Sequence, residues 1–570
     1  MRTLDWLVLV GTIGAIVIYG MWKGRRAGSS AQSYVLAGRE MPWFTVAISV
    51  MATQASAITF LSTPGQGYAD GLRFSQFYFG LPIAMVVLCA TAVPIFQRLG
   101  VFTAYEYLEQ RFDLKTRTLT SLLFLTQRGL GAGFGIYAPA AVLSVLMGWN
   151  IQVTTLVIGA AIILYTTSGG AEAVGRTQVQ QFSVAIAGMA VAFLATVALL
   201  PDGVGVGDAA LVAGAAGRMR AVTFDLDLKD RYNLWSGLLG GGFVALAYFG
   251  TDQSQVQRYL AGASIRESRL GLIFNGVMKI PMQVGILFLG TMVFAAHHFV
   301  LPPLYHNPVE AQLASQGPRG AEMRSLQDRH EMAFADRRRA ALELVSAAER
   351  GDDAALSMAK SALGEAEARF DGIHNEAAAL VRSSVPGSDG NDVNYVFLRF
   401  VLEHLPAGLV GLMLAVVFCS AMSASSAALN ALATTTMVDV YHRLIAPQAT
   451  DAQTVRAARV ATVGWGLFSI ACAQFANRLG TLIEAVNVMG SLFYGTILGI
   501  FLTAFYCRSV GATAVFIAAV VTEATVLAVH FSTDAFSYLW YNVIGAVMVV
   551  ALGYLFQALL GGGKRAARSL

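Results

Sequence analysis

Charged residues are scarce in this sequence. They make up 13% of its 570 residues, whereas a typical soluble domain carries roughly 25% charged residues. Hydrophobic residues make up 56% of the chain. This composition excludes an ordinary soluble protein, a disordered chain and a coiled coil. It predicts an all-α membrane protein that crosses the lipid bilayer many times.

Motifs for several kinds of chemistry are missing as well. The four cysteines lie in apolar runs without a CxxC pair, so we expect buried thiols rather than disulfides or a metal site. The absence of a GxxxxGKS/T motif argues against ATP-driven pumping. Because no basic stripe occurs outside short loops, nucleic-acid binding is not expected. Neither a nucleophile beside a base nor a set of metal ligands is visible, so we do not expect an enzyme.

The charges that are present cluster in one segment. Residues 302–394 contain 10 Lys or Arg and 15 Asp or Glu side chains. Two stretches rich in Ala, Glu, Arg and Leu, 333–350 and 354–381, are separated by Gly351 and two aspartates. This pattern predicts a soluble helical hairpin. The hairpin is either a solvated appendage or an element that docks a partner or acts as a lid.

Apolar runs long enough to cross the bilayer occur thirteen times, since a membrane-spanning helix needs about 20 such residues. They lie near 4–22, 43–66, 74–97, 118–147, 151–168, 178–200, 235–257, 271–300, 397–438, 460–477, 480–506, 511–530 and 537–560. With the N-terminus outside, the cytoplasmic loops hold 19 Lys or Arg, and the external loops without the insert hold seven. Because basic residues favour the cytoplasmic side, we expect an external N-terminus and insert and a cytoplasmic C-terminus. The expected location is the inner (cytoplasmic) membrane of a bacterium.

Small and polar residues interrupt the second apolar run between 52 and 65. Pro64 and Gly65 weaken the helix further. A broken helix frees backbone carbonyls, and at membrane depth this is tolerated only where the backbone is buried in protein or lines a cavity. Such carbonyls are suitable ligands for a small cation. The alternative is close packing of two helices through their small residues.

A serine cluster lies in the ninth apolar run. Ser423 and Ser426 are three residues apart, so they share one helix face. Their hydroxyl groups could complete an oxygen cage around a cation. The alternative is that each serine bonds to the backbone one turn earlier in its own helix.

Three charged residues lie within apolar runs, where an ionisable side chain is costly and indicates function by default. Lys279 and Arg128 lie inside their runs, and Arg128 has no acid in its own helix. We therefore expect Arg128 to meet a carboxylate of a substrate, with protein dipoles or Glu106 from a loop as the alternative. Asp252 is near a predicted cytoplasmic end, so we interpret it as a charge at the membrane interface.

Six short segments carry a family resemblance: 103–112, 136–140, 169–177, 248–260, 437–441 and 490–495. In this order they resemble the sodium/solute symporter family, which includes the sodium/glucose, proline, pantothenate and sialic acid cotransporters. The resemblance implies a LeuT-like core of five plus five inverted-repeat helices, preceded by one helix and followed by two. On this division, residues 1–301 hold the extra helix and the first seven core helices, 302–394 form the insert, and 395–570 hold the rest. It also implies sodium-driven uptake by alternating access.

The resemblance assigns candidate sodium ligands. Family members hold sodium between carbonyls of the broken helix and serine hydroxyls of the ninth span. The family's second hydroxyl position is Ala424 here, so water or a neighbouring serine is expected to take its place. Gln178 stands where the family often has an aspartate, which argues against a second sodium ion. The candidate ligands are Ala52, Ala55, Ser420, Ser423 and Ser426.

Candidate substrate ligands follow from the same resemblance. Tyr248 matches the family's gate tyrosine. Sugar-binding members have an asparagine three residues earlier and an acid in the third span, but these positions are Ala245 and Tyr78 here, which disfavours a neutral sugar. Sialic acid members have hydroxyls on the broken helix and an arginine in the fourth span, similar to Ser56, Thr59 and Arg128. The full predicted set is Gln54, Ser56, Thr59, Tyr78, Arg128, Tyr248 and Lys279.

These observations predict a sodium-coupled secondary active symporter that imports a small polar organic solute, with a carboxylate or sugar acid as the favoured class. One alternative is a proton-coupled or sodium-independent relative, suggested by Ala424 and Gln178. Another is a transporter-like solute sensor in which the insert reports ligand binding to an external partner. A sugar substrate also stays open. Sodium, the solute and the lipid bilayer are the expected partners.

Overall fold

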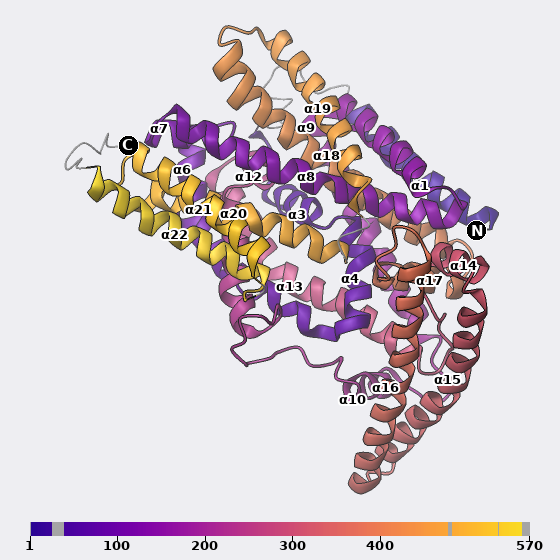
Figure 1. Cartoon of the computed structure of the whole chain (residues 1–570). Helices are drawn as coiled ribbons and strands as arrows, with labels where there is room; N and C mark the ends of the chain where they lie inside the picture. Colours follow the sequence, from indigo (N-terminus) through magenta and orange to yellow (C-terminus); the bar gives the residue numbers. More distant parts are fainter. Residues whose placement is uncertain (1, 25–38, 477–480, 534, 561–570) are drawn as a thin grey trace.

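The computed structural model describes residues 2–24, 39–476, 481–533 and 535–560 (Figure 1). In these ranges the chain forms helices joined by loops, and the only β-type pairing is one isolated bridge between Met41 and Gly262. Eight helices in the same ranges are long and apolar enough to cross a membrane. The all-α membrane class is confirmed, while the count of thirteen spans stays a prediction.

The helices follow the division of the chain by the insert. Those before it are α1 (Thr3–Gly24), α3 (Trp43–Gln54), α4 (Ala57–Asp70), η2 (Gly71–Tyr78), α5 (Leu81–Ala90), α6 (Ala92–Leu99), α7 (Ala104–Arg111), α8 (Leu114–Met147), α9 (Ile151–Val197), α10 (Val206–Ala215), η3 (Ser236–Gly241), α11 (Gly242–Gly250), α12 (Gln253–Leu260) and α13 (Ile265–Ala296). Those of the insert are α14 (Pro308–Gln316), α15 (Gly320–Glu349) and α16 (Asp353–Ser384). Those after it are α17 (Val393–His404), α18 (Leu409–Thr435), η4 (Thr436–Ile445), α19 (Asp451–Ala473), α20 (Leu482–Tyr506), α21 (Ala512–Ser532) and α22 (Tyr538–Leu559).

The second apolar run is a broken helix, as the sequence predicts. α3 ends at Gln54 and α4 begins at Ala57. Between them, Ala55 has φ −86° and ψ 74°, and Ser56 is extended with φ −79° and ψ 175°. A helix end leaves its last carbonyls without partners in the helix. The break therefore presents carbonyl oxygens inside the protein.

A second break interrupts the predicted span 235–257. α11 ends at Gly250, and Asp252 has extended backbone angles of φ −79° and ψ 117°. Oδ1 of Asp252 accepts hydrogen bonds from the N–H and the hydroxyl of Ser254, at 2.9 and 2.6 Å, and so caps α12. The described part of the chain therefore contains these two interrupted helices, one before and one after α8 and α9.

Two predicted boundaries differ from the structure. The runs 151–168 and 178–200 belong to one helix, α9, of 47 residues. At 1.5 Å per residue this helix is about 70 Å long, more than twice the roughly 30 Å of a bilayer core. The run 397–438 is divided between α17 and α18, which are separated by residues 405–408.

Small residues bring α4 and α13 into backbone contact. A Cβ atom added at Gly290 would lie 1.9 Å from the carbonyl oxygen of Pro64, and one at Gly67 would lie 2.3 Å from that of Leu287. Any larger side chain at either glycine would push the two helices apart. The contact places α13, which carries Lys279, directly beside the broken helix.

The insert is a helical hairpin, as predicted, and its α15–α16 pair projects away from the rest of the molecule (Figure 1). At its base, Nε of Arg337 lies 2.6 Å from Glu367, and the same carboxylate lies 3.1 Å from Nε2 of His298, two residues after α13. Burial alone would raise the pKa of Glu367, but His298 and Arg337 lower it to about 2. This ion-pair cluster ties the hairpin to the membrane core.

A second contact holds the base of the insert at His374 of α16. Its Nδ1 lies 3.0 Å from the carbonyl oxygen of Leu304, and its Nε2 lies 3.5 Å from Oδ1 of Asp392. Two acceptors facing both ring nitrogens favour the imidazolium form. Burial lowers the pKa of His374, but the hydrogen bond and the charge of Asp392 outweigh this and raise the pKa from 6.5 to about 9.

We expect the base of the insert to loosen as the pH rises through about 9. A group whose pKa is raised in the folded state stabilises fully below its unfolded pKa and loses this contribution as the pH passes the folded-state value. Hydrogen exchange in 302–308 and 370–392, corrected for intrinsic rates, should be about 10-fold faster at about pH 10 than at about pH 8. His374→Gln should abolish this pH dependence, whereas His442→Gln, at an exposed position outside the insert, should retain it. The same acceleration in both variants would contradict the role of His374.

Candidate substrate cavity and sodium site

A cavity of about 140 Å³ is lined by both broken helices together with η2, α8, α13 and α20. Every side chain of the predicted substrate set lines it, although these residues come from distant parts of the chain. They are Gln54, Ser56, Thr59, Tyr78, Arg128, Tyr248 and Lys279. The structure therefore brings the whole predicted set together, and the binding of a solute by it stays a prediction.

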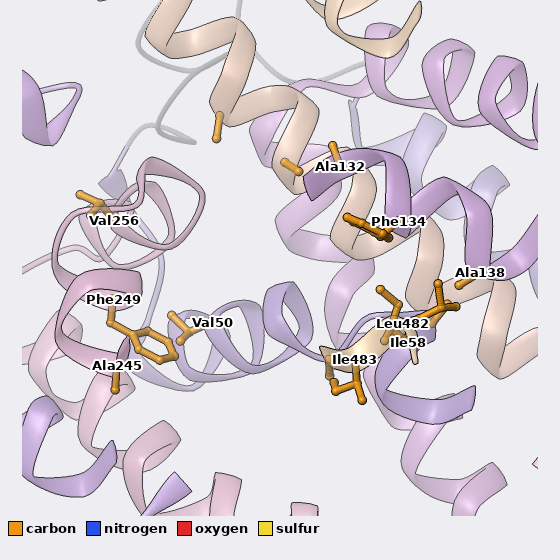
Figure 2. Close-up of a cluster of buried hydrophobic side chains, with 14 of the residues drawn as sticks. Val50, Ile58, Ala132, Phe134, Ala138, Ala245, Phe249, Val256, Leu482 and Ile483 are labelled. Atoms are coloured by element: carbon orange, nitrogen blue, oxygen red, sulfur yellow. The ribbon is translucent and has the colours of Figure 1, made fainter. Parts of the chain in front are cut away.

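Apolar side chains form most of the remaining wall. Ala245 and Phe249 of α11 lie on one side, and Ile58 of α4 with Ile483 of α20 lie on another (Figure 2). A mostly apolar wall with a few polar groups is the usual build of a site for a small organic molecule. The cavity thus suits a solute with both a polar and an apolar part.

Arg128 is neutralised within the protein. Its Nη2 forms an ion pair with Oδ2 of Asp252 and lies 3.1 Å from the hydroxyl of Tyr494, which donates to the same carboxylate at 2.8 Å. Its guanidinium also lies 5.4 Å from the centroid of the Tyr248 ring. The interpretation of Asp252 as an interface charge is wrong, since its exposed fraction is 1%. Because Asp252 supplies the countercharge, Arg128 does not require an anionic substrate, and Glu106 is not its partner.

Lys279 is the ionisable side chain of the cavity that has no countercharge among the described residues. Its exposed fraction is 1%, and its Nζ lies 5.2 Å from the centroid of the Tyr78 ring. Among the residues that the structure describes, no carboxylate lies within 4 Å of Nζ and no acceptor bonds to it. The lining residues other than Arg128 and Lys279 are all formally neutral. A buried amine without a countercharge holds its proton most readily when an anion binds beside it, so this site favours an anionic ligand.

Several residues around the cavity escaped the sequence reasoning. Gln127, Asn487 and Tyr494 line it, and Asn275 bonds to the side chain of Gln54. A signal existed for two of them, because Gln127 is next to Arg128 and Tyr494 lies in the family-like segment 490–495. Asn275 and Asn487 lie in apolar stretches without a motif, so only their placement reveals them.

One contact between predicted sodium ligands joins the broken helix to α18. The hydroxyl of Ser423, 2% exposed, lies 3.4 Å from the carbonyl oxygen of Ala52, and Ala55 is at the break itself. Ser420 is one turn before Ser423 and is also buried. The hydroxyl of Ser426 instead donates to the carbonyl of Ser423 at 3.1 Å, so it is engaged within its own helix. Carbonyl and hydroxyl oxygens are the hard ligands that a small cation prefers.

Gln178 occupies the position beside this site with a neutral amide. Its Oε1 accepts a hydrogen bond from Ser49 at 2.5 Å, and its Nε2 lies 3.1 Å from Oγ1 of Thr53. Both polar ends of the amide are therefore used to bind α3. This arrangement leaves no carboxylate at the position where the resemblance places one.

A smaller cavity, of about 30 Å³, lies one helical turn away along α4. Leu61 and Leu482 line the smaller cavity. Their near neighbours Ile58 and Ile483 line the larger one. The two ends of the insert contribute Glu310, Asp389 and Asn391 to its wall. The base of the insert is thus part of a solvent-sized space that adjoins the candidate substrate site.

Comparison with known proteins gives a consistent family. The model of the sodium:solute symporter family matches residues 34–314 and 368–521. Human sodium-coupled monocarboxylate transporter 1 is 31% identical over 297 residues, 52% of this chain and 48% of the relative. The human sodium/iodide cotransporter is 33% identical over 260 residues, 45% of this chain and 40% of the relative. The match thus spans less than half the length of these two relatives.

One bacterial relative aligns over nearly its whole length. The sodium/sialic acid symporter NanT of Aliivibrio fischeri (strain ATCC 700601 / ES114) is 24% identical over 559 residues, 97% of this chain and 92% of the relative. The solved structure of a substrate-bound, outward-open Na+-coupled sialic acid symporter shares the fold, with a TM-score of 0.74 at 22% identity and full coverage of both chains. These relatives are transporters, which agrees with the expectation that the chain is not an enzyme. The family model covers most of the chain, and the chain therefore belongs to the sodium:solute symporter family.

Proposed function

We propose that this protein is a sodium-coupled symporter that imports a small organic acid by alternating access. The observation that carries the substrate class is Lys279, a buried amine that faces the cavity without an anionic partner among the described residues. A carboxylate of the solute would supply the missing anion and accept hydrogen bonds from Nζ. Three relatives are named for anionic solutes, namely monocarboxylates, iodide and sialic acid, which supports this class.

We assign the remaining lining groups to orientation of the solute. Ser56 at the break, Thr59 on α4 and Gln54 on α3 offer hydrogen bonds to hydroxyl or carbonyl groups of the acid. The Arg128–Asp252 pair closes one wall of the cavity next to Tyr248. A polyhydroxy acid uses more of these groups than a simple monocarboxylate does, and both fit the proposal.

The proposed sodium ion binds to the carbonyls of Ala52 and Ala55 and to the hydroxyls of Ser423 and Ser420. The same broken segment carries Ser56 into the cavity. An ion that orders this segment therefore raises the affinity for the solute, and the solute raises the affinity for sodium equally, with a coupling of about 1–3 kcal/mol. We propose one sodium ion, because the amide of Gln178 replaces a carboxylate.

We propose that the N-terminus and the insert 302–394 are external, that the C-terminus is cytoplasmic and that the protein resides in the inner membrane of a bacterium. The distribution of 19 basic residues in the cytoplasmic loops against seven outside supports this orientation. The smaller cavity then lies on the external side, where the insert borders the route to the substrate site. The insert is proposed as part of this border, and we assign it no partner protein.

Ser423→Ala is expected to lower the apparent affinity for sodium about 10-fold or more, because a cation in a buried site loses an oxygen ligand. The measurement is a sodium titration of solute uptake in proteoliposomes. Ser425→Ala is the matched control, since Ser425 lies in the same buried helix with a hydroxyl that bonds to nothing in the described residues. If both variants titrate like the wild type, Ser423 is not a sodium ligand.

A thermal-shift screen tests the substrate class. Organic acids and their neutral amides or alcohols are compared in sodium chloride and in choline chloride. We expect an acid to stabilise the protein more in sodium than in choline. Its neutral amide should stabilise the protein little in either salt. If a neutral compound stabilises the protein as strongly as its acid does, binding does not require a carboxylate. The family assignment would be unaffected.

A further inference from the structure

We infer that Asn275 is a positioning residue that transmits the ordering of the sodium site to Lys279, a role that rests on the function proposed above. Asn275 is completely buried in α13 and is not among the described residues that line the cavity. Its Oδ1 accepts a hydrogen bond from Nε2 of Gln54. The bond joins the broken helix to α13.

Gln54 is the residue through which the two candidate sites meet. It is the last residue of α3, so it lies between the sodium-facing carbonyls of Ala52 and Ala55. Its side chain lines the cavity, and its carbonyl oxygen lies 3.4 Å from the hydroxyl of Thr59 on the far side of the break. A cation that fixes the backbone at 52–55 therefore also fixes where the Gln54 amide points.

Asn275 links the position of the Gln54 amide to the part of the cavity wall that contains Lys279. It lies four residues before Lys279, so both side chains project from the same face of α13. Its Nδ2 has only the weak sulfur acceptor of Met85, at 4.0 Å, in the described part of the chain. Gln54 is thus its strong partner, and a disordered Gln54 leaves Asn275 without one. Losing a partner is costly for a buried amide, which makes the bond sensitive to the state of the break.

The surrounding packing makes this route direct. A Cβ atom added at Gly271 would lie 2.6 Å from Cγ1 of Val46, and one at Gly276 would lie 2.8 Å from Cγ of Met85. α13 is therefore in close contact with α3 on one side of Asn275 and with α5 on the other. A shift of α3 therefore acts on α13 directly, without an intervening loop.

The test uses sodium alone, with the full-length protein in lipid nanodiscs. Hydrogen exchange is measured for peptides covering 52–59 and 272–283 in sodium chloride and in choline chloride. In the wild type, sodium should slow exchange about 5-fold or more in both peptides, within the usual range of coupling between sites. Asn275→Leu should keep the effect in 52–59 to within about twofold and lose it in 272–283.

Two further variants and a control distinguish loss of the Gln54–Asn275 hydrogen bond from a general disturbance of the fold. Gln54→Leu removes the same bond from the other side and should also uncouple 272–283. The swap Gln54→Asn with Asn275→Gln keeps an amide pair of the same total length and should restore the coupling. Gln283→Leu is the matched control, because it removes a buried amide from the same helix that is unbonded in the described residues, and it should leave the coupling unchanged.

The outcomes distinguish this inference from the proposed function. If sodium protects 272–283 in Asn275→Leu as it does in the wild type, Asn275 transmits nothing and the inference is wrong. The swap variant remaining uncoupled while it is folded would equally overturn the amide pair as the link. If sodium fails to protect 52–59 in the wild type, the proposed sodium site itself is wrong.

Discussion

Lys279→Gln is expected to lower the affinity for the imported acid about 100-fold or more. The substitution leaves the carboxylate of the solute in a buried site without its cation, and breaking a buried ion pair costs about 3–5 kcal/mol, where every 1.4 kcal/mol is about tenfold in affinity. The affinity for the neutral amide of the same acid should change by less than about threefold, because the amide needs no countercharge. Isothermal titration with the acid and the amide, both in saturating sodium, measures the difference.

Lys360→Gln is the matched control for this prediction. Lys360 lies on the exposed face of α16, in the insert, so the same change of charge occurs far from the cavity. It should leave both affinities unchanged. Equal losses for acid and amide in Lys279→Gln would mean that the lysine shapes the cavity without binding an anion.

Asp252→Asn is expected to destabilise the folded protein by about 3–5 kcal/mol, because it leaves the guanidinium of Arg128 buried without its countercharge. Arg128→Gln should destabilise for the reciprocal reason. The double variant should be more stable than the sum of the two losses predicts, by about 0.5–3 kcal/mol of coupling. Thermal unfolding in a fixed detergent, without solute, compares the four proteins.

The double-variant cycle also decides the role of Arg128 in binding. If the two single losses simply add, the ion pair contributes no coupling and Arg128 is free to bind the solute directly. If they couple, the pair is a fixed part of the wall. The hydroxyl of Tyr494 bonds to both partners, so the loss of its hydrogen bonds contributes to each single loss and the measured coupling belongs to all three residues.

The cost of polar groups in the membrane, together with the family resemblance, made most of the site predictable. Each predicted substrate residue is polar or aromatic within an apolar run, and each lines the cavity. The broken second helix followed from its small and polar residues, and the structure places the break at Ala55 and Ser56. The break and the charges within apolar runs are local patterns that one sequence reveals, whereas Tyr78 and Tyr248 were predicted from the family resemblance.

Pairing between distant residues was not predictable in the same way. Arg128 and Asp252 are 124 positions apart, and whether they meet depends on how two helices cross. The second break, at Asp252, has no proline and follows an ordinary apolar run, so the sequence suggested a helix end at the membrane surface. Asn275 is hidden for a related reason, since its partner Gln54 is 221 positions away.

The same distinction applies to the fold, because local features were predictable and contacts between distant elements were not. The insert was visible because its charges contrast with the rest of the chain, and its turn was visible at Gly351. The contacts that anchor it, such as Arg337 with Glu367 and His298, join separate elements and carry no local pattern. The undivided helix α9 also escaped the prediction, because the polar residues between its apolar halves resemble those of a loop.

Uptake into proteoliposomes tests the central claim most directly. The purified protein is reconstituted, and the acid that stabilises it most in the thermal-shift screen is supplied outside, with an inward gradient of either sodium or choline at equal ionic strength. The proposed function predicts accumulation of the acid above its external concentration with sodium, only equilibration or less with choline, and no accumulation of the neutral amide. Equal uptake in sodium and in choline would contradict sodium coupling.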